Sequence, residues 1–216
     1  MSCLGKMERI FIDFDGVIVD SNKFKETAIE TSIIKLLGKN KKNTEAINYF
    51  NLNAGISRNL KLSKFFKKED ISKILKIYNE ECLDFFSKVY PTKGFREFLD
   101  HIKCRINNVK FYVLSGGEKG EIEFFLKKNL LFDYFEEILA SEKNKFDHLV
   151  EKDVSENDIF IGDSNNDLKA ALKINIKFIL FKKYKSLKSF PSKEFIKKHV
   201  FLETDDFKSL IKEIAL

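Results

Sequence analysis

The sequence predicts a doubly wound α/β fold, with a parallel sheet covered by helices on both faces and a small all-helical segment inserted after the first strand. Short apolar runs recur along the 216 residues with helical patterns between them. These runs are continuous rather than alternating, which is typical of strands buried on both faces of a parallel sheet. In addition, residues 21–90 show helical patterns and no strand pattern. Strands that alternate with helices, together with one helical insert, indicate this fold class.

Five apolar runs bounded by turn signals are the predicted strands. They cover residues 9–14, 109–114, 137–140, 159–161 and 176–181. Helical patterns at 121–128 and 167–173 lie between the later runs. Ligands of such sheets bind beyond the carboxyl ends of the strands. We therefore expect functional residues directly after these runs.

The segment 21–90 is predicted to be a helical insert, which leaves residues 1–20 and 91–216 as the core. Apolar residues between 71 and 89 recur at the spacing of one helix face, and Asp70 is the predicted N-cap of this helix. A second apolar stripe, within 24–37, ends before Gly38. The segment is longer than a normal crossover between strands, so helices that simply pack on the sheet are the weaker alternative.

Composition argues against several classes of protein. The net charge is +6, but the lysines are spread among 33 acidic residues, so a solvated lysine face explains them better than nucleic-acid binding. The start lacks a signal-peptide stretch and no apolar run reaches the roughly 18 residues of a membrane span, so we expect a cytoplasmic protein without a membrane partner. Three widely spaced cysteines are expected to be reduced. The oligomeric state is left open.

Acidic side chains follow two of the predicted strands. Asp13 and Asp15 end the first apolar run, and Asp163 and Asp167 follow the fourth. Ser115 follows the second run. Neighbouring carboxylates repel and raise each other's pKa, so this pattern is unfavourable without a cation or hydrogen-bond donors. We expect these residues to converge on one site that binds a cation.

A calcium-binding EF-hand loop is the obvious alternative for each acidic cluster. From Asp13, the loop positions that need an oxygen ligand and a glycine hold Val17 and Ile18. In the second cluster, Leu168 replaces the glycine and Ile174 the terminal glutamate. Neither cluster therefore matches an EF-hand loop. One Mg²⁺, which prefers few carboxylates and a substrate phosphate oxygen, would instead satisfy both clusters. Mg²⁺ is therefore the predicted cofactor.

Four segments in order carry a family resemblance: DFDGVIVDS, VLSGG, a downstream lysine and GDSNND. They resemble the four motifs of the haloacid-dehalogenase-like (HAD) superfamily of phosphohydrolases, and the insert resembles its C1-type helical cap. The segment NAGISR is similar to the substrate-facing cap loop of phosphoglycolate phosphatase and β-phosphoglucomutase relatives. Dehalogenating members lack an aspartate at the position of Asp15, so the resemblance implies a Rossmann-like core that performs phosphoryl transfer.

The resemblance implies a role for each acidic residue. Asp13 is expected to be the nucleophile that forms an aspartyl-phosphate, and Asp15 to protonate the leaving oxygen and then deprotonate water. Asp13, Asp163 and the backbone carbonyl of Asp15 are the expected Mg²⁺ ligands. Asp167 is expected to bond metal-bound water or the family's lysine.

The substrate phosphate has its own expected partners. By the resemblance, Ser115 donates its hydroxyl to a phosphate oxygen, and Gly116 and Gly117 let backbone N–H groups approach it. The family's lysine neutralises charge on the transferring group. SEKNKFDHL offers Lys143 and Lys145, and Lys145 is preferred because K-x-x-H-L resembles a form seen in relatives.

The cap loop is where we expect the substrate to be selected. Asn53, Gly55 and Arg58 match the relatives' loop, and Arg58 could aim its guanidinium at the far polar end of the substrate. A plain loop between helices is the alternative. Elsewhere, Asn175 departs from the family, since relatives often have glycine there.

These observations predict a Mg²⁺-dependent phosphatase of a small phosphorylated metabolite, with a sugar phosphate as one candidate. The first alternative is a phosphomutase of the β-phosphoglucomutase type, which returns the phosphoryl group to its substrate. The second is a non-catalytic binding protein on the same fold, which the complete set of acidic motifs disfavours. A phosphatase of nucleic-acid ends is a more remote alternative.

Overall fold

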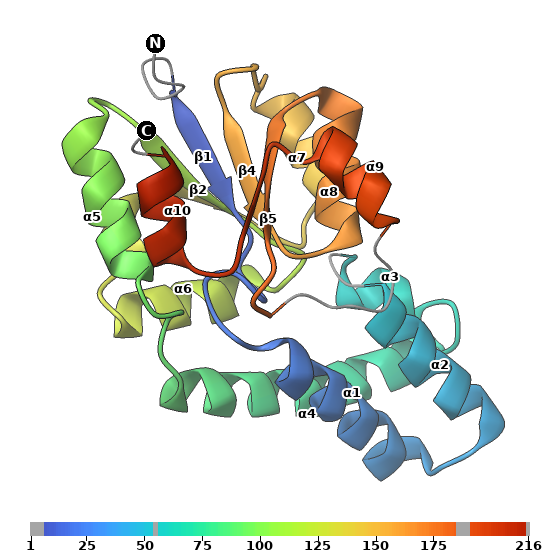
Figure 1. Cartoon of the computed structure of the whole chain (residues 1–216). Coiled ribbons are helices and arrows are strands. Elements are labelled where there is room, and N and C mark those ends of the chain that lie inside the picture. Colours follow the sequence, from blue (N-terminus) through green and yellow to red (C-terminus); the bar gives the residue numbers. More distant parts are fainter. Residues whose placement is uncertain (1–6, 54–55, 185–190, 215–216) are drawn as a thin grey trace.

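Six strands form one parallel sheet in the computed structural model, which describes residues 7–53, 56–184 and 191–214 (Figure 1). The sheet has the order β3-β2-β1-β4-β5-β6, so β1 lies between β2 and β4. The strands are β1 (Arg9–Ile12), β2 (Lys110–Leu114), β3 (Phe135–Leu139), β4 (Ile159–Gly162), β5 (Lys177–Phe181) and β6 (Leu202–Thr204). The chain starts in the middle of the sheet and winds outwards in both directions, which confirms the predicted fold class.

All five predicted runs form strands, with small differences at their ends. The first run stops at Ile12, so Asp13 and Phe14 lie beyond the strand rather than inside it. The sixth strand, β6, was not predicted. Its sequence, LET, is short and mostly polar, and it lies at the edge of the sheet, where only one neighbour imposes an apolar pattern.

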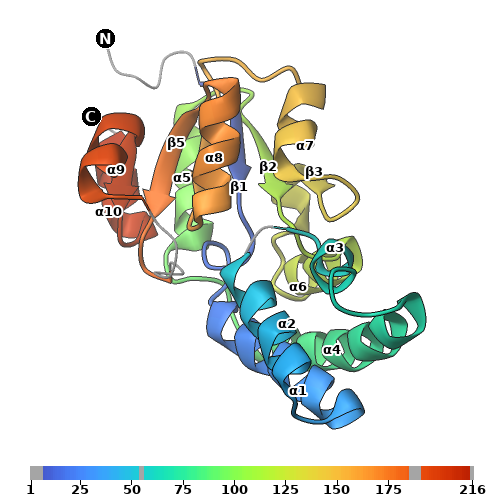
Figure 2. The same ribbon diagram turned by 90° about the vertical axis from the view of Figure 1, so that its right-hand side faces the viewer.

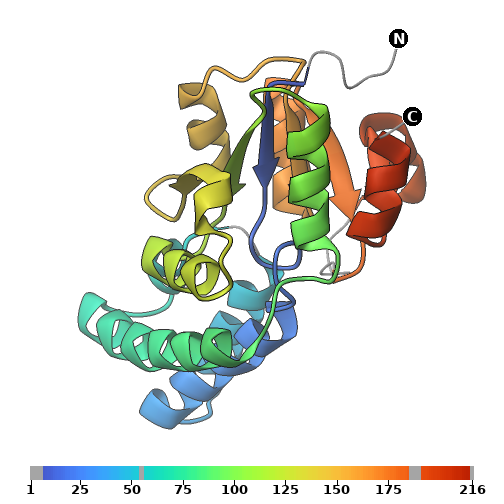
Figure 3. The same cartoon turned by 90° about the vertical axis from the view of Figure 1, so that its left-hand side faces the viewer.

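Helices cover both faces of the sheet (Figures 1 and 3). On β1, Ile10 and Ile12 pack with one set of helices, whereas Phe11 packs with the other. The first set contains α5 (Phe95–Arg105) and α10 (Phe207–Ile214), and the second contains α7 (Lys145–Glu151), α8 (Asn165–Ile174) and α9 (Lys193–His199). Helix α6 (Lys119–Lys128) and the 3₁₀ turn η1 (Phe132–Tyr134) connect β2 to β3.

Four helices of the insert lie together beyond the carboxyl ends of the strands (Figure 2). They are α1 (Asn22–Leu37), α2 (Lys41–Leu52), α3 (Arg58–Leu62) and α4 (Lys68–Lys88). Among the described residues of this segment no strand occurs. The insert thus covers the edge of the sheet where ligands of such folds bind. Its exact boundaries at residues 21 and 90 stay a prediction.

Two helix ends within the insert can be compared with expectation, and one differs. Helix α1 ends at Leu37 before Gly38, as its apolar stripe predicts. The predicted N-cap at Asp70 is wrong, because α4 starts at Lys68 and places Asp70 in its first turn. There a carboxylate still favours the helix, since it faces the positive end of the helix dipole. In the core, Asn175 has a positive φ of 60° at the end of α8, a conformation that asparagine tolerates better than most residues.

A buried aromatic cluster joins the insert to the core. Phe14, just after β1, packs edge-on against Phe86 of α4 and Phe125 of α6, with ring centroids 5.4 and 5.3 Å away. The returning chain is tied to the outgoing one by Thr92, whose hydroxyl donates to the carbonyl of Val17 at 2.7 Å. These contacts hold the start of α1 and the end of α4 against the sheet.

Two expectations from composition concern the whole chain. Cys82 and Cys104 are free thiols, as predicted, and Cys3 lies outside the described residues. None of the helices in the described ranges is both long enough and apolar enough to cross a membrane.

Candidate active site

Three polar side chains lie directly after three neighbouring strands. Asp13 follows β1, Ser115 follows β2 and Asp163 follows β4, and all three are buried. Because these strands are parallel and adjacent, their carboxyl ends meet at one edge of the sheet. The fold therefore gathers residues that are up to 150 positions apart in the chain.

Asp13, Asp163 and Asp167 form a buried carboxylate cluster. One oxygen from each carboxylate lies within 4.8 Å of the other two. Asp167 is held by the N-terminus of α8, where it accepts hydrogen bonds from the backbone N–H of Ser164 at 3.0 Å and from its hydroxyl at 2.6 Å. The Ser164 hydroxyl accepts the backbone N–H of Asp167 in return, which completes a capping box. The short segment GDSNND thus fixes the position of Asp167 by itself.

Lys145 neutralises part of this cluster. Its ammonium lies 2.8 Å from Oδ1 of Asp13 and 2.5 Å from Oδ1 of Asp167. Burial would lower the pKa of Lys145, but the two carboxylates raise it more, so the group stays charged. Lys143, the other candidate, is exposed and pairs with Glu151 on the surface. The structure therefore brings Lys145, and not Lys143, to the predicted nucleophile.

The carboxylate cluster fits a divalent cation. Burial and the charge of Asp167 raise the pKa of both Asp13 and Asp163 well above the usual range. Lys145 supplies one positive charge for three carboxylates, which leaves negative charge in excess. Carboxylate oxygens are the ligands that Mg²⁺ prefers, and a cation there would relieve the repulsion between them.

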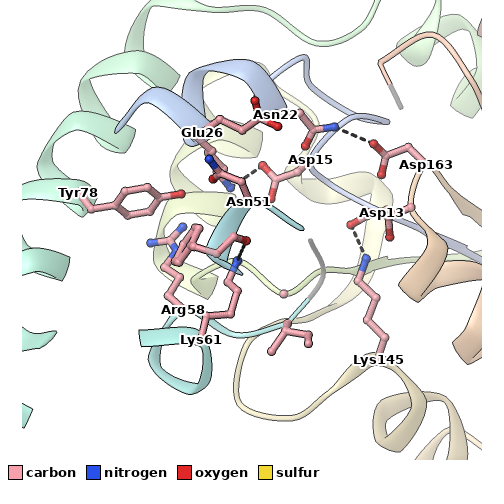
Figure 4. A pocket seen from close by; sticks show the side chains of 16 residues that line it. Asp13, Asp15, Asn22, Glu26, Asn51, Arg58, Lys61, Tyr78, Lys145 and Asp163 are labelled. Atoms are coloured by element: carbon pink, nitrogen blue, oxygen red, sulfur yellow. Dashed lines mark hydrogen bonds and ion pairs between the residues drawn. The ribbon is translucent and has the colours of Figure 1, made fainter. Parts of the chain in front are cut away.

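A glycine turn allows β1 to approach this cluster. Gly16 has a φ of +80°, and a Cβ atom at this position would lie 2.1 Å from Oδ2 of Asp163. The same carboxylate oxygen accepts a hydrogen bond from the side-chain amide of Asn22 at 2.7 Å (Figure 4). Asn22 is the first residue of α1, so the insert and the core meet at Asp163.

Asp15 lies in the same pocket but has different partners. Its Oδ1 accepts a hydrogen bond from Ser21 at 2.5 Å and lies 2.5 Å from the ammonium of Lys25 on α1. Burial alone would raise the pKa of Asp15, but Lys25 and Ser21 more than offset burial and lower it. Asp15 is therefore ionised in this arrangement. An ionised carboxylate can act as a base at once, whereas it must first gain a proton to act as an acid.

The predicted phosphate-binding turn lies at the end of β2. The backbone N–H of Gly117 donates to the hydroxyl oxygen of Ser115 at 3.0 Å, which fixes that hydroxyl. Gly116 and Gly117 line the pocket beside Asp13 and Asp15. A Cβ atom at Gly117 would lie 3.2 Å from the Ser115 oxygen, so the turn is close-packed around this group.

Arg58 lies in the pocket wall, but its guanidinium already has a carboxylate partner. It makes a two-contact ion pair with Glu121 of α6, with Nη1 2.6 Å from Oε1 and Nη2 against Oε2. Nη1 also donates to Asn79 at 2.7 Å, and the guanidinium lies over the ring of Tyr78. Gly55, which was predicted to belong to the same cap loop as Arg58, lies outside the described residues.

The cap side of the pocket carries residues that sequence reasoning missed. Lys61 of α3 and Asn51 of α2 lie with Arg58 across the pocket from Asp13 and Asp163 (Figure 4). Lys61 is buried, yet among the described residues its ammonium contacts the ring of Phe50 and, at 3.5 Å, the carbonyl of Phe50.

Weak sequence signals for the missed residues existed. Lys25 precedes Ala28 and Ile29 by three and four positions, so it lies on the buried face of α1. Lys61 stands three residues after Arg58 and next to buried Leu62. A lysine at a position that helix periodicity buries needs a polar partner or a function. Glu121 carried no such signal, because its partner Arg58 is 63 residues away.

Comparison with known proteins agrees with this geometry. Residues 10–181 match the family model of the haloacid dehalogenase-like hydrolases. No curated protein matches the chain by sequence. The matched segment contains both acidic clusters, the serine turn and Lys145.

Solved structures of low sequence identity share the fold. A predicted phosphoglycolate phosphatase from Haemophilus somnus is 14% identical with a TM-score of 0.73, over 96% of this chain and 98% of that one. CbbY from Rhodobacter sphaeroides, in complex with phosphate, is 16% identical with a TM-score of 0.72, over 97% and 100% of the two chains. A hydrolase from Pseudomonas syringae is 15% identical with a TM-score of 0.75, over 97% and 98%. The fold agrees along nearly the whole chain and the family model covers most of it, so the chain belongs to the haloacid dehalogenase-like hydrolases.

Proposed function

We propose that the protein is a Mg²⁺-dependent phosphatase that hydrolyses a small phosphorylated metabolite through an aspartyl-phosphate on Asp13. The observation that carries the proposal is the contact of Asp13 with Lys145 at 2.8 Å, in a pocket that Asp15 also lines. A carboxylate can attack a negatively charged phosphate only where nearby positive charge offsets their repulsion. The chain's membership of the haloacid dehalogenase-like hydrolases and the ligands of one structural neighbour support the same chemistry.

One of the structural neighbours has been crystallised with phosphate and, as a mutant, with a phosphorylated sugar. CbbY from Rhodobacter sphaeroides has been crystallised in complex with phosphate and with xylulose-(1,5)bisphosphate. The Haemophilus somnus protein is a predicted phosphoglycolate phosphatase. By analogy we propose a phosphomonoester of similar size for this chain.

In the first step, a carboxylate oxygen of Asp13 attacks phosphorus and the bond to the leaving oxygen breaks. Asp15 gives its proton to that oxygen, so the product leaves as a neutral alcohol. The Ser115 hydroxyl and the backbone N–H of Gly116 bind the phosphate oxygens, while the N–H of Gly117 holds the Ser115 oxygen in place. Lys145 offsets the charge that the attack brings next to Asp13.

In the second step, water attacks the phosphorus of the aspartyl-phosphate and Asp15 takes its proton. The P–O bond to Asp13 breaks, inorganic phosphate leaves, and the carboxylate is restored. The lowered pKa of Asp15 suits this basic role. The acidic role in the first step requires a proton, and the negative charge of an incoming phosphate favours its uptake, because a nearby like charge raises a carboxyl pKa.

Asp13 and Asp163 are the side chains that we propose to hold Mg²⁺, with the backbone carbonyl of Asp15 as a third ligand. The ion would supply positive charge for the phosphate and for the crowded carboxylates. Asp167 contributes indirectly, since its two oxygens are engaged by Lys145 and Ser164. It orients the lysine toward Asp13.

The test is a screen of phosphorylated metabolites with Mg²⁺, scored by released inorganic phosphate. Asp13→Asn should abolish release while the protein stays folded. Asp20→Asn is the matched control, because Asp20 lies in the same motif but is exposed. Continuous release of phosphate distinguishes a phosphatase from a phosphomutase. Release that persists in Asp13→Asn would refute the mechanism, and no release from any metabolite would favour a non-catalytic protein.

A further inference from the structure

We propose that Lys61 binds a second anionic group of the substrate, so that the enzyme prefers phosphomonoesters with a carboxylate or another phosphate at the far end. This inference rests on the proposed phosphatase function and names its substrate class. Of the cations around the pocket that the structure describes, all but one have a carboxylate partner.

Among the described residues, four cations line the pocket, and three of them are already paired with carboxylates. Lys25 pairs with Asp15 at 2.5 Å and Lys145 with Asp13 at 2.8 Å. The guanidinium of Arg58 is held by both oxygens of Glu121. Because Glu121 already neutralises Arg58, this arginine is not available to bind an anion at the far end of the substrate, which is the role that the family resemblance implies for it.

Lys61 is the remaining cation. It is 7% exposed and lines the pocket, and within the described part of the chain no carboxylate lies in salt-bridge range of its ammonium. Its nearest contacts are the Phe50 ring, with the centroid 3.5 Å away, and the Phe50 carbonyl, also at 3.5 Å. A buried ammonium needs stronger partners than these, and an anionic ligand would provide them.

Asn51 gives an independent indication at the same wall. Its side-chain oxygen is buried and has no hydrogen-bond partner among the residues described. Buried amide oxygens are nearly always paired, so a missing partner in a pocket suggests a ligand group. An asparagine amide can accept a hydrogen bond from a hydroxyl or, turned over, donate to an anion. Asn51 and Lys61 both line the side of the pocket opposite the carboxylate cluster (Figure 4).

The protonation of Lys61 should respond to such a ligand. Burial, together with the positive charges of Arg58 and Lys25, lowers the pKa of Lys61 to about 7, and Asp15 opposes this only in part. Glu26 and Tyr78 also line this part of the pocket. An anion beside Lys61 would favour its charged form. Binding near neutral pH should then be accompanied by proton uptake.

The kinetic test compares substrates that differ only at the far end. Phosphoglycolate is paired with 2-hydroxyethyl phosphate, and fructose 1,6-bisphosphate with fructose 6-phosphate. The wild-type protein should have the higher kcat/KM for the charged member of at least one pair, and that pair identifies the anion as carboxylate or phosphate. Lys61→Met should reduce this preference about 10- to 100-fold, mainly through KM, since a hydrogen bond to a charged group is lost.

Two further variants serve as controls. Lys64→Met removes an exposed lysine three residues away and should keep the wild-type preference. Lys61→Arg keeps the positive charge and should retain more of the preference than Lys61→Met does. If the wild-type protein has no preference for a charged end, or if Lys61→Met slows both members of a pair equally, the inference is wrong.

A binding test does not depend on turnover. In Asp13→Asn protein, calorimetric titration with the same ligands in two buffers of different ionisation enthalpy measures proton uptake. At pH 7, binding of the ligand with the charged far end should be accompanied by the uptake of about half a proton more than binding of its partner with an uncharged far end. The reason is that Lys61, whose pKa is about 7, becomes fully protonated beside the anion. Lys61→Met should abolish the difference. If proton uptake differs between the two ligands and this difference depends on Lys61, but no substrate releases phosphate, the proposed function is refuted and this inference stands. If phosphate is released but Lys61→Met has no effect, only this inference is refuted.

Discussion

Arg58 of the helical insert and Glu121 of the core helix α6 form a buried ion pair with two contacts. Both side chains are almost fully buried, and Asn79 of α4 accepts a further hydrogen bond from Arg58 at 2.7 Å. The pair therefore joins the insert to the core beside the pocket. Within the described ranges it also leaves Lys61, rather than Arg58, as a cation without a carboxylate partner on that side.

Glu121→Gln should destabilise the protein strongly. Arg58 would remain charged and buried without a counter-ion, and breaking a buried pair in this way costs about 3–5 kcal/mol of the free energy of unfolding. Urea denaturation of the variant measures the loss. Glu123→Gln on the same helix is the control, because it removes a solvent-accessible pair with Lys127 and should change stability by less than about 0.5 kcal/mol.

The double replacement Arg58→Met with Glu121→Met separates charge from packing. It removes both charges and keeps apolar volume, so it should regain much of the stability that Glu121→Gln loses. If the double variant is no more stable than Glu121→Gln, the cost does not come from an unpaired charge.

Gly16→Ala should impair activity far more than stability alone would explain. A Cβ atom there would lie 2.1 Å from Oδ2 of Asp163, so the carboxylate must move. A displacement of this kind in a catalytic group can lower kcat/KM by about 100-fold. Gly38→Ala is a matched control, because Gly38 also has a positive φ but its Cβ would meet nothing within 4 Å. It should cost about 1–3 kcal/mol of stability and leave kcat/KM unchanged. Equal effects of both changes on kcat/KM would contradict this account.

The sheet and the acidic residues could be predicted because their signals are local. A buried parallel strand is a continuous apolar run, and Asp13 and Asp163 are found directly after two such runs. Capping of α8 by Ser164 and Asp167 likewise lies within four residues. Such features need no knowledge of the tertiary structure.

The pairing of Arg58 could not be predicted in this way. Its partner Glu121 lies on a different helix, 63 residues away in the sequence, so no periodicity connects them. The same holds for Lys25 and Asp15, which become neighbours only when α1 folds back over the end of β1. Edge strand β6 was missed for a related reason, because it pairs with one neighbour only.

Lys25→Met should change how stability depends on pH. The pKa of Asp15 is lowered in the folded protein, so its ionisation stabilises the fold above the unfolded value of about 4, and this contribution disappears as pH falls through the folded pKa. Without Lys25, burial dominates and should raise that pKa, so ionised Asp15 then destabilises the fold at neutral pH. The difference in the free energy of unfolding between wild type and variant should therefore be largest near pH 7 and shrink toward pH 3.

Urea denaturation across this pH range, with chelator present, measures the difference. Lys23→Met is the control, because that lysine is exposed and its ion pair with Glu26 is long, at 3.7 Å. A Lys25→Met effect that is the same at every pH would mean that the lysine acts through its cation–π contacts with Phe14 and Phe86 rather than through its ion pair with Asp15.

Asp163→Asn should abolish the stabilisation of the protein by Mg²⁺. Burial and Asp167 raise the pKa of Asp163, so its ionisation at neutral pH costs stability when no cation is bound. Replacing it by the neutral amide removes that cost, and without metal the variant should be at least as stable as the wild type. With Mg²⁺ at about 100 times its Kd, the wild type should gain about 2.7 kcal/mol in the free energy of unfolding, whereas the variant should gain almost nothing. Asp20→Asn should respond as the wild type does. A wild-type protein whose unfolding is unaffected by Mg²⁺, or a variant that responds equally, would show that this carboxylate cluster does not bind the ion.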